Sequence, residues 1–194
     1  MKKLIGLSDE EISKIGKLIG EAYYAEDDPM IRIFDSKEEC ITYFTLITRM
    51  CMEGDILYTI SDNYEGFVAY YTKKHVPYMA MIKLLFRLNK SGIMPALKKF
   101  GETHKGWIET NKKYKKEKNF IEVYMACVPV EHQGKGYLHK LLEEPFRIAR
   151  ENHIPCIIET NTDLKAAKYQ KCGLSVSDRR EFSSGVVMYS LEYR

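Results

Sequence analysis

The sequence predicts an α/β fold, and we expect residues 1–194 to form one domain. Segments with apolar residues at helical spacing alternate with short apolar runs, which favours helices combined with a sheet. Two of the helical segments begin with a capping box, and one strand leads directly into a glycine turn and another helix. A chain of 194 residues can bury the core of one domain, or of one domain with a sizeable insertion.

Two capping boxes mark helix starts in the N-terminal part. In each, a serine precedes a glutamate by one helical turn, from Ser8 to Glu11 and from Ser36 to Glu39, and apolar residues at helical spacing follow. The first helix should end near Pro29, because a proline disfavours helical backbone in the residue before it. The strands expected in this part cover residues 3–7, 55–60 and 67–71, with a turn at 62–66. The helix residues expected to face inward are Ile12, Ile15, Ile19, Ala22, Cys40, Phe44, Ile47 and Cys51.

Residues 76–118 predict a helical insertion before the central strand. Their apolar residues indicate one amphipathic helix and then one or two more helices. The end of the insertion is rich in lysine, which suits a solvated helix face or an electropositive rim that attracts an anionic substrate or cofactor. The residues that indicate the first helix are Met79, Ile82, Leu85 and Phe86, and the lysines are Lys112, Lys113, Lys115, Lys116 and Lys118.

The C-terminal part is predicted to hold a central strand, two helices and three further strands. Residues 120–128 are almost all apolar, which is typical of a strand covered on both faces. In the next helix, Pro145 should cause a kink or a break, because proline removes an internal hydrogen bond. The second helix should begin after Asn161 or Thr162 and end before Gly173. The expected helices cover residues 136–151 and the segment up to 172, and the further strands cover 156–160, 174–177 and 186–191.

The stretch from Val128 to Leu142 carries the most chemical information. It reads V-P-V-E-H-Q-G-K-G-Y-L-H-K-L-L, so a strand runs into two glycines and an apolar helix follows at once. Such a turn points several backbone N–H groups and a helix N-terminus at one place, which suits a phosphate. A P-loop is excluded because the GxxxxGK[ST] pattern is absent, and a dinucleotide fingerprint is excluded because G-x-G-x-x-G is not completed.

Two segments of the chain resemble motifs of the GNAT superfamily of N-acetyltransferases. Gln133-Gly134-Lys135-Gly136 resembles the family's Q/R-x-x-G-x-G/A segment, and residues 166–174 (A-A-K-Y-Q-K-C-G-L) resemble its A-x-x-x-Y-E-K-x-G-F segment. A helix and a strand are expected between the two, as in the family. The resemblance covers residues 120–189 well, and the earlier residues only in the order of their elements. It implies a mixed, mostly antiparallel sheet with helices on both faces and a V-shaped split that holds acetyl-CoA.

The resemblance also implies a binding site for acetyl-CoA. The pantetheine arm would lie along the end of the central strand, and backbone amides of the glycine turn would hold the pyrophosphate. Leu138 departs from the family pattern of glycine or alanine, so its side chain must turn toward the core. Lys135 either adds a charged contact or is simply exposed. The residues expected to bind acetyl-CoA are Ala126, Cys127, Val128, Gln133, Gly134, Lys135, Gly136, Tyr137, Leu138 and His139.

Acetyl transfer to an amine needs a base and an acid, and the resemblance implies candidates for both. Some histone-acetylating members carry a glutamate base at the place of Glu122. Strand alternation puts Glu122 on the same face as Tyr124, Ala126 and Val128. Glu159 on the next strand is a competing candidate, and a water relayed by either carboxylate would also serve. Tyr169 corresponds to the family tyrosine that protonates the departing CoA thiolate.

Other nucleophilic or basic residues near these motifs are weaker candidates. His132 and His139 flank the turn and are expected to be exposed or to act as weak phosphate donors. Cys127 could carry an acetyl group, but direct transfer is commoner in the family and a buried strand cysteine is usually inert. No His/Cys pair has metal-ligand spacing, so no metal site is expected.

The expected reaction is direct attack of a small-molecule primary amine on acetyl-CoA. The acceptor half should be built from residues 23–34 and from the insertion, and the acidic segment that begins at Glu26 resembles small-molecule acetyltransferases of the puromycin-resistance type. Two alternatives remain open. One is a peptide or protein N-acetyltransferase, whose lysine-rich insertion docks a macromolecule, and the other is a non-catalytic acyl-CoA-binding module.

Composition sets the expected surroundings and partners. The net charge of +3 is too small to argue for nucleic acid by itself, and no apolar run reaches the roughly 18 residues of a membrane span. Five cysteines without CxxC spacing and no recognisable signal peptide favour reduced cytosolic thiols. We therefore expect a cytoplasmic monomer or homodimer, with neither a nucleic acid nor a membrane as partner.

Overall fold

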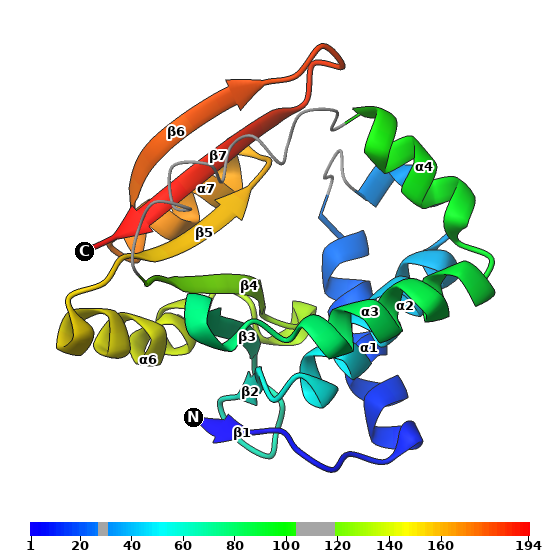
Figure 1. The fold of residues 1–194 in the computed structure, drawn as a ribbon, viewed down its shortest axis with the longest axis horizontal. Coiled ribbons are helices and arrows are strands. Elements are labelled where there is room, and N and C mark those ends of the chain that lie inside the picture. Colours follow the sequence, from blue (N-terminus) through cyan, green and yellow to red (C-terminus); the bar gives the residue numbers. More distant parts are fainter. Residues whose placement is uncertain (27–30, 104–118) are drawn as a thin grey trace.

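The structure, a computed structural model, describes residues 1–26, 31–103 and 119–194. Its strands form one seven-stranded sheet in the order β1-β2-β3-β4-β5-β7-β6 (Figure 1). Strands β4 and β5 are parallel, and the other neighbouring strands are antiparallel. This confirms the predicted mixed, mostly antiparallel sheet. The strands are β1 Lys2–Lys3, β2 Leu57–Thr59, β3 Phe67–Thr72, β4 Ile121–Cys127, β5 Cys156–Thr160, β6 Ser175–Glu181 and β7 Val187–Tyr193.

The helices cover both faces of the sheet, as predicted. One core lies between the sheet and helices α1 to α4, and a second lies between the sheet and helices α6 and α7. Strand β3 contributes to both, because Phe67, Ala69 and Tyr71 enter the first core while Val68 and Tyr70 enter the second. The α-helices are α1 Asp9–Tyr24, α2 Lys37–Glu53, α3 Tyr78–Lys90, α4 Met94–Thr103, α6 Tyr137–Asn152 and α7 Asp163–Lys171. The short 3₁₀ helices are η1 Ile31–Ile33, η2 Lys73–His75 and η4 Val130–His132.

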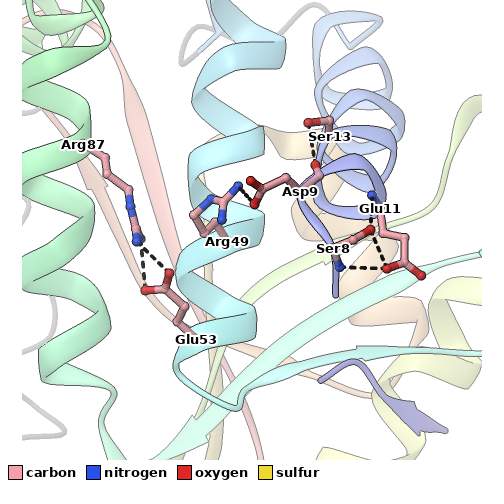
Figure 2. A network of polar contacts seen from close by, with 7 residues as sticks. All are labelled: Ser8, Asp9, Glu11, Ser13, Arg49, Glu53 and Arg87. Carbon is pink, nitrogen blue, oxygen red and sulfur yellow. Dashed lines mark hydrogen bonds and ion pairs between the residues drawn. The ribbon is translucent and has the colours of Figure 1, made fainter. Parts of the chain in front are cut away.

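Helices α1 and α2 start where the sequence predicts. The capping box of α1 is complete, because Ser8 and Glu11 each accept a hydrogen bond from the other's backbone N–H. In α2, Ser36 caps the backbone N–H of Glu39, but the Glu39 carboxylate accepts from the N–H of Asp35 instead. Asp9 of α1 pairs with Arg49 of α2 at 2.7 Å, which ties the two helices together (Figure 2). The inward-facing residues predicted for these helices are all buried.

Two element ends differ from the prediction. The first strand covers Lys2–Lys3 instead of residues 3–7, because Gly6 turns the chain with a φ of +63°. Helix α1 ends at Tyr24, several residues before the predicted end, and Glu26 just beyond it turns toward α7. Residues 27–30 lie outside the described part of the chain.

Helix α3 forms as predicted, but the apolar residues that predicted it face outward. Met79, Leu85 and Phe86 are at least 66% exposed, and the helix packs on the first core through Ala80, Leu84 and Leu88 instead. Helical spacing shows that a helix has an apolar side, but it does not show whether that side is buried. The exposure of this side of α3 could therefore not be predicted from the sequence. Helix α4 covers the first part of the next predicted helical region. The lysine-rich segment at residues 112–118 lies outside the described residues.

The C-terminal elements match the predicted order with two differences. Helix α6 continues through the buried Pro145, so the predicted break is absent. Strand β6 runs to Glu181, beyond its predicted end. The prediction was too short because the side chains of this strand are mostly exposed and form no apolar pattern in the sequence. Helix α7 begins after Thr162, whose hydroxyl accepts from the backbone N–H of Lys165 at 3.2 Å, and Gly173 follows its end with a φ of +102°. No helix within the described ranges is both long and apolar enough to cross a bilayer.

Candidate active site

The sheet opens between its two parallel strands. Strands β4 and β5 pair only from Ile121 to Val123, opposite Cys156 to Ile158. Beyond that point β4 stays paired with β3 as far as Cys127, and β5 stays paired with β7 as far as Thr160. The two halves of the sheet therefore separate, and Figure 1 shows β5, β7 and β6 turned away from β4. This is the V-shaped split that the resemblance implied.

A β-bulge in β4 lies at the point where the split begins. Ala69 of β3 faces Met125, whereas the next residue, Tyr70, faces Val123, so Tyr124 is the extra residue of β4. The bulge reverses the strand's alternation. Ile121 and Val123 enter the core with α6 and α7, while Met125 and Cys127 enter the core with α1 to α4.

The bulge corrects one expectation from the sequence. Glu122 lies opposite Tyr71, a residue of the core with α1 to α4, whereas Ala126 and Val128 pack against the core with α6 and α7. Glu122 therefore does not share their face, although Glu122 and Ala126 are even-numbered residues of β4 and Val128 directly follows the strand. Simple alternation failed because the bulge depends on how β4 pairs with β3.

The glycine turn lies at the end of β4 and leads into α6. Gly134 and Gly136 have φ angles of +76° and +78°, in the left-handed region that favours glycine. A Cβ added at either position would meet no atom within 4 Å, so the turn faces open space. Gly136 is the N-cap of α6 and has no side chain to satisfy the helix N–H groups. The first N–H groups of α6 are therefore available to an anion, and the helix dipole favours negative charge there.

The side chains around the turn point away from this opening or lie on the surface. Leu138 packs against the core with α6 and α7, as its departure from the family pattern required. Gln133 donates from its side-chain amide to the carbonyl of Val128 at 3.2 Å. Lys135 donates to the carbonyl of Glu131 at 2.9 Å, so its ammonium stabilises the turn itself. His139 is exposed on the first turn of α6.

Two carboxylates interact electrostatically where the split begins. Burial raises the pKa of Glu122, a hydrogen bond with Tyr71 opposes this, and the nearby charge of Glu159 raises that pKa further. Glu159 of β5 accepts a hydrogen bond from the Ser190 hydroxyl of β7 at 3.2 Å. The two competing base candidates therefore belong to one cluster, in which the charge of Glu159 helps to raise the pKa of Glu122.

Tyr169 and Cys127 lie farther along the split, near enough for electrostatic interaction. Tyr169 of α7 is 8% exposed, and burial together with the charge of Glu26 raises the pKa of its phenol. Cys127 of β4 is also buried, and burial raises the pKa of its thiol, with Glu26 adding to the effect and Lys165 opposing it. Both groups keep their protons near neutral pH, so Tyr169 is available as a hydrogen-bond donor and Cys127 is a poor nucleophile.

A set of contacts from the end of α1 crosses the split. The Glu26 carboxylate pairs with Lys165 at 2.9 Å and with Lys168 at 3.5 Å, both on α7. The Lys165 ammonium lies 5.0 Å from the ring centre of Tyr23. The Tyr23 hydroxyl in turn donates to the carbonyl of Ala126 at 3.5 Å.

The sequence placed Glu26 in a candidate acceptor segment but did not predict these partners. The available signal was that Lys165 and Lys168 are one turn apart and so lie on one face of α7. Nothing local connects that face with Glu26, which lies 142 residues from Lys168 along the chain. The split thus gathers Glu122 with Glu159, Tyr169 with Cys127, and a bridging ion pair that sequence reasoning missed.

Solved structures with the same fold are known. The C-terminal condensation domain of Ebony in complex with beta-alanyl-dopamine has a TM-score of 0.61 and 11% identity, covering 96% of this chain and 95% of that one. Arylalkylamine N-acetyltransferase 2 from Aedes aegypti has a TM-score of 0.56 and 11% identity, covering 96% and 94%. A GNAT-family acetyltransferase from Desulfovibrio desulfuricans has a TM-score of 0.54 and 13% identity, covering 95% and 92%.

These structures share the architecture of this chain at low sequence identity. No protein-family model and no curated protein sequence matches the chain. The similarity confirms the expected fold, which is that of the GNAT acetyltransferases.

Proposed function

We propose that this protein is an N-acetyltransferase that transfers the acetyl group of acetyl-CoA to a primary amine of a small molecule by direct attack. The observation that supports it most is the split between β4 and β5, which ends at a glycine turn and the N-terminus of α6. An extended ligand with a phosphate at one end and a thioester at the other fits such a split. The fold shared with acetyltransferases supports the same proposal.

The residues at the mouth of the split suit acetyl-CoA as donor. Gly134 and Gly136 leave open space beside backbone N–H groups, where the pyrophosphate would lie. Beyond Val123, the edge of β4 that faces β5 makes no strand pairing, so its main-chain groups can bond the amides of the pantetheine arm. The proposed contacts come from Ala126, Cys127, Val128, Gln133, Gly134, Lys135, Gly136, Tyr137, Leu138 and His139.

The acceptor amine must lose a proton before it attacks. A primary amine with a pKa of about 10.4 is neutral in only ~1 part in 2,500 at pH 7, a handicap of about 4.6 kcal/mol. Glu122 is the proposed base, because burial and the charge of Glu159 raise its pKa toward the pH at which a base works best. Glu122 precedes Ala126 by about 13 Å of extended strand, so we infer that a chain of ordered waters relays the proton from the amine to Glu122.

Tyr169 is the proposed acid for the departing thiolate. It is buried beside Cys127, at the end of β4 where the thioester would lie. Its phenol remains protonated because burial raises its pKa, so it acts by hydrogen bonding to the developing negative charge on sulfur. Cys127 is buried and keeps its proton, which supports direct transfer over an acetyl-cysteine intermediate.

The acceptor side is proposed to lie at the end of α1. Glu26 supplies a carboxylate near Tyr169 and Cys127, and an acceptor ammonium could exchange with the lysines that pair with it. Aromatic side chains surround this position, with Tyr23 stacked on Phe44 at 4.3 Å. A carboxylate beside aromatic rings suits a cationic small amine. Among the proteins with this fold are an arylalkylamine N-acetyltransferase and the Ebony domain in complex with beta-alanyl-dopamine.

Thiol release tests the proposal directly. The protein is mixed with acetyl-CoA and a panel of small aromatic and aliphatic amines, polyamines and lysine-containing peptides, and free CoA is followed with a thiol reagent. We expect turnover with at least one small amine, and its loss in Tyr169→Phe or Glu122→Gln. Turnover with peptides alone would favour a protein N-acetyltransferase. Tight acetyl-CoA binding without turnover on any amine would favour a non-catalytic binding module.

A further inference from the structure

Helix α3 presents a continuous apolar face to solvent. Five large side chains of this helix are between 47% and 70% exposed. At about 100° per residue, they occupy an arc of roughly 120° on one side of the helix. Single exposed apolar residues are ordinary, but an exposed stripe along more than two turns of one helix marks an interaction surface. The residues of this apolar face are Tyr78, Met79, Ile82, Leu85 and Phe86.

The other side of α3 is firmly attached to the protein, so the apolar face cannot turn inward without breaking contacts. Ala80, Leu84 and Leu88 are buried in the core with α1 and α2. Arg87 makes a two-pronged ion pair with Glu53 of α2, at 2.7 Å and 3.0 Å (Figure 2). In Figure 2 the guanidinium points from α3 toward α2, which fixes the inward side of the helix.

The sequence around the apolar face carries charge of one sign. Residues 73–101 contain no aspartate or glutamate. Lys83 and Lys90 directly border the apolar face on α3, because helical geometry places them about 20–40° beyond Met79. Lys74 is exposed just before the helix. The positively charged residues of the segment are Lys73, Lys74, Lys83, Arg87, Lys90, Lys98 and Lys99. Of these, Lys83 and Arg87 pair with Glu53 of α2, and Lys99 pairs with Asp35.

The size and charge of this surface indicate its partner. At ~200 Å² for a large side chain, the apolar face exposes roughly 600 Å², less than the ~800 Å² per partner of a standard protein interface. In a symmetric contact between two copies, α3 would meet α3 and its basic border would meet like charge. An anionic lipid surface instead accepts the apolar side chains between its headgroups and attracts the lysines.

We propose that α3 docks this protein on an anionic membrane surface, with its apolar face in the headgroup region and Lys74 and Lys90 against the lipid phosphates. The attachment is peripheral. Its geometry requires only that α3 lie parallel to the membrane, which its position on the outside of α2 allows. The sequence had given no reason to expect a membrane partner, because α3 is too short and too charged to span one.

Vesicle sedimentation tests the proposal with the intact protein. Vesicles of phosphatidylcholine with phosphatidylserine should bind at least tenfold more protein than vesicles of phosphatidylcholine alone. Raising the salt to roughly 0.5 M should release most of it, because salt screens surface charge. Absence of binding to the anionic vesicles would overturn the proposal, as would equal binding to both compositions.

Matched variants locate the contact on α3. The double variant Leu85→Ser/Phe86→Ser changes two exposed residues, so it should keep the melting temperature and lose binding at least tenfold. Ile5→Ser, which changes a residue 63% exposed elsewhere on the surface, should bind like the parent. Lys74→Glu/Lys90→Glu provides an independent test that leaves the apolar face intact, and it should also lose at least tenfold.

Two other partners of the apolar face, a second copy of the chain and an acidic protein, would give different experimental results. If the apolar face joins two copies, sedimentation equilibrium will show a dimer that dissociates in Leu85→Ser/Phe86→Ser, and vesicles will not compete. If it binds an acidic protein, polyglutamate will retain the parent and anionic vesicles will not. Either result would overturn the membrane proposal.

Discussion

At the scale of single residues, Glu122 illustrates how burial converts a carboxylate into a base. In water a carboxyl group is too acidic to take a proton from an ammonium group near neutral pH. Burial and the charge of Glu159 raise the pKa of Glu122, whereas its hydrogen bond with Tyr71 limits the rise. A neighbouring negative charge raises the pKa of a carboxyl group because two like charges at close range are unfavourable.

The first prediction concerns Glu122→Gln, which should lower kcat about 100-fold. It should also stabilise the protein at neutral pH. A buried carboxyl with a raised pKa contributes its full stability below the ordinary pKa of 4.5, and loses it as pH rises through the raised value. Glutamine imitates the protonated form and does not ionise. The melting temperature of the variant relative to the parent should therefore increase between about pH 4 and pH 8.

Thermal melts of both proteins across this pH range check the prediction, together with kcat at saturating acetyl-CoA. Glu143→Gln, which changes an exposed carboxylate of α6 in the same way, is the matched control and should leave kcat and the pH dependence of the melting temperature unchanged. A destabilised Glu122→Gln at pH 8, or unchanged kcat, would contradict the assigned role.

The second prediction concerns Tyr169→Phe, which removes one hydroxyl from a buried ring. Because the phenol is proposed to act only on the departing sulfur, kcat should fall about 100-fold while the Kd for acetyl-CoA stays within a factor of about two. Steady-state kinetics and calorimetry measure the two quantities separately. Equal losses in both would show that Tyr169 is structural.

At the scale of elements, the glycine turn links backbone geometry to the proposed phosphate site. Gly134 and Gly136 adopt left-handed backbone, which lets the chain turn from β4 into α6 with its N–H groups facing outward. The sequence predicted this turn because two glycines between a strand and a helix form a local signal. It could not predict the bulge at Tyr124, which arises from the pairing of two strands far apart in the chain.

The third prediction concerns Gly136→Ala. The left-handed φ of +78° should make the alanine cost about 1–2 kcal/mol of stability, and the new methyl group would enter the space proposed for the phosphates. Acetyl-CoA binding should weaken about tenfold. Gly92→Ala is the control, because Gly92 has a φ of +81° and similarly open surroundings but lies after α3.

Both variants should melt at lower temperature than the parent, and calorimetry should show weaker acetyl-CoA binding only in Gly136→Ala. If Gly92→Ala weakened binding equally, the effect would be a general loss of stability. If neither did, the turn would not be the phosphate site.

The fourth prediction concerns the contact between α1 and α2. A Cβ added at Gly20 would lie 2.7 Å from the Cα of Ile41, so the two helix backbones approach closely at this point. Gly20→Ala should cost about 1–3 kcal/mol and lower the melting temperature by roughly 5 °C. Gly101→Ala in α4 meets nothing within 4 Å and should instead leave stability unchanged or raise it. Thermal melts of the two variants test this, and equal effects would contradict the close approach.

At the scale of the whole molecule, features that depend on short segments could be predicted from the sequence, and features that depend on distant contacts could not. Helix starts, the central strand and the turn follow from short segments, so the sequence predicted them along with the face that each early helix buries. The outward face of α3 and the pairing of Glu26 with Lys165 depend on which distant elements lie nearby. Strand β6 was underestimated because a mostly exposed strand lacks an apolar pattern.

The residues proposed to bind and to react with acetyl-CoA are divided between the two halves of the sheet. Strand β4 and the glycine turn belong to one half, while β5 and β7 belong to the other. In the structure, Glu26 bridges from α1 to Lys165 and Lys168 of α7. The central claim is that acetyl-CoA lies in the split between these halves and touches both.

Binding of acetyl-CoA tests this claim most directly. A ligand present at one hundred times its Kd should stabilise the protein by about 2.7 kcal/mol, which for a chain of this size is a rise in melting temperature of roughly 5–10 °C. The rise should shrink in Gly136→Ala and persist in Tyr169→Phe. An unchanged melting temperature with acetyl-CoA and with longer acyl-CoAs would contradict the account.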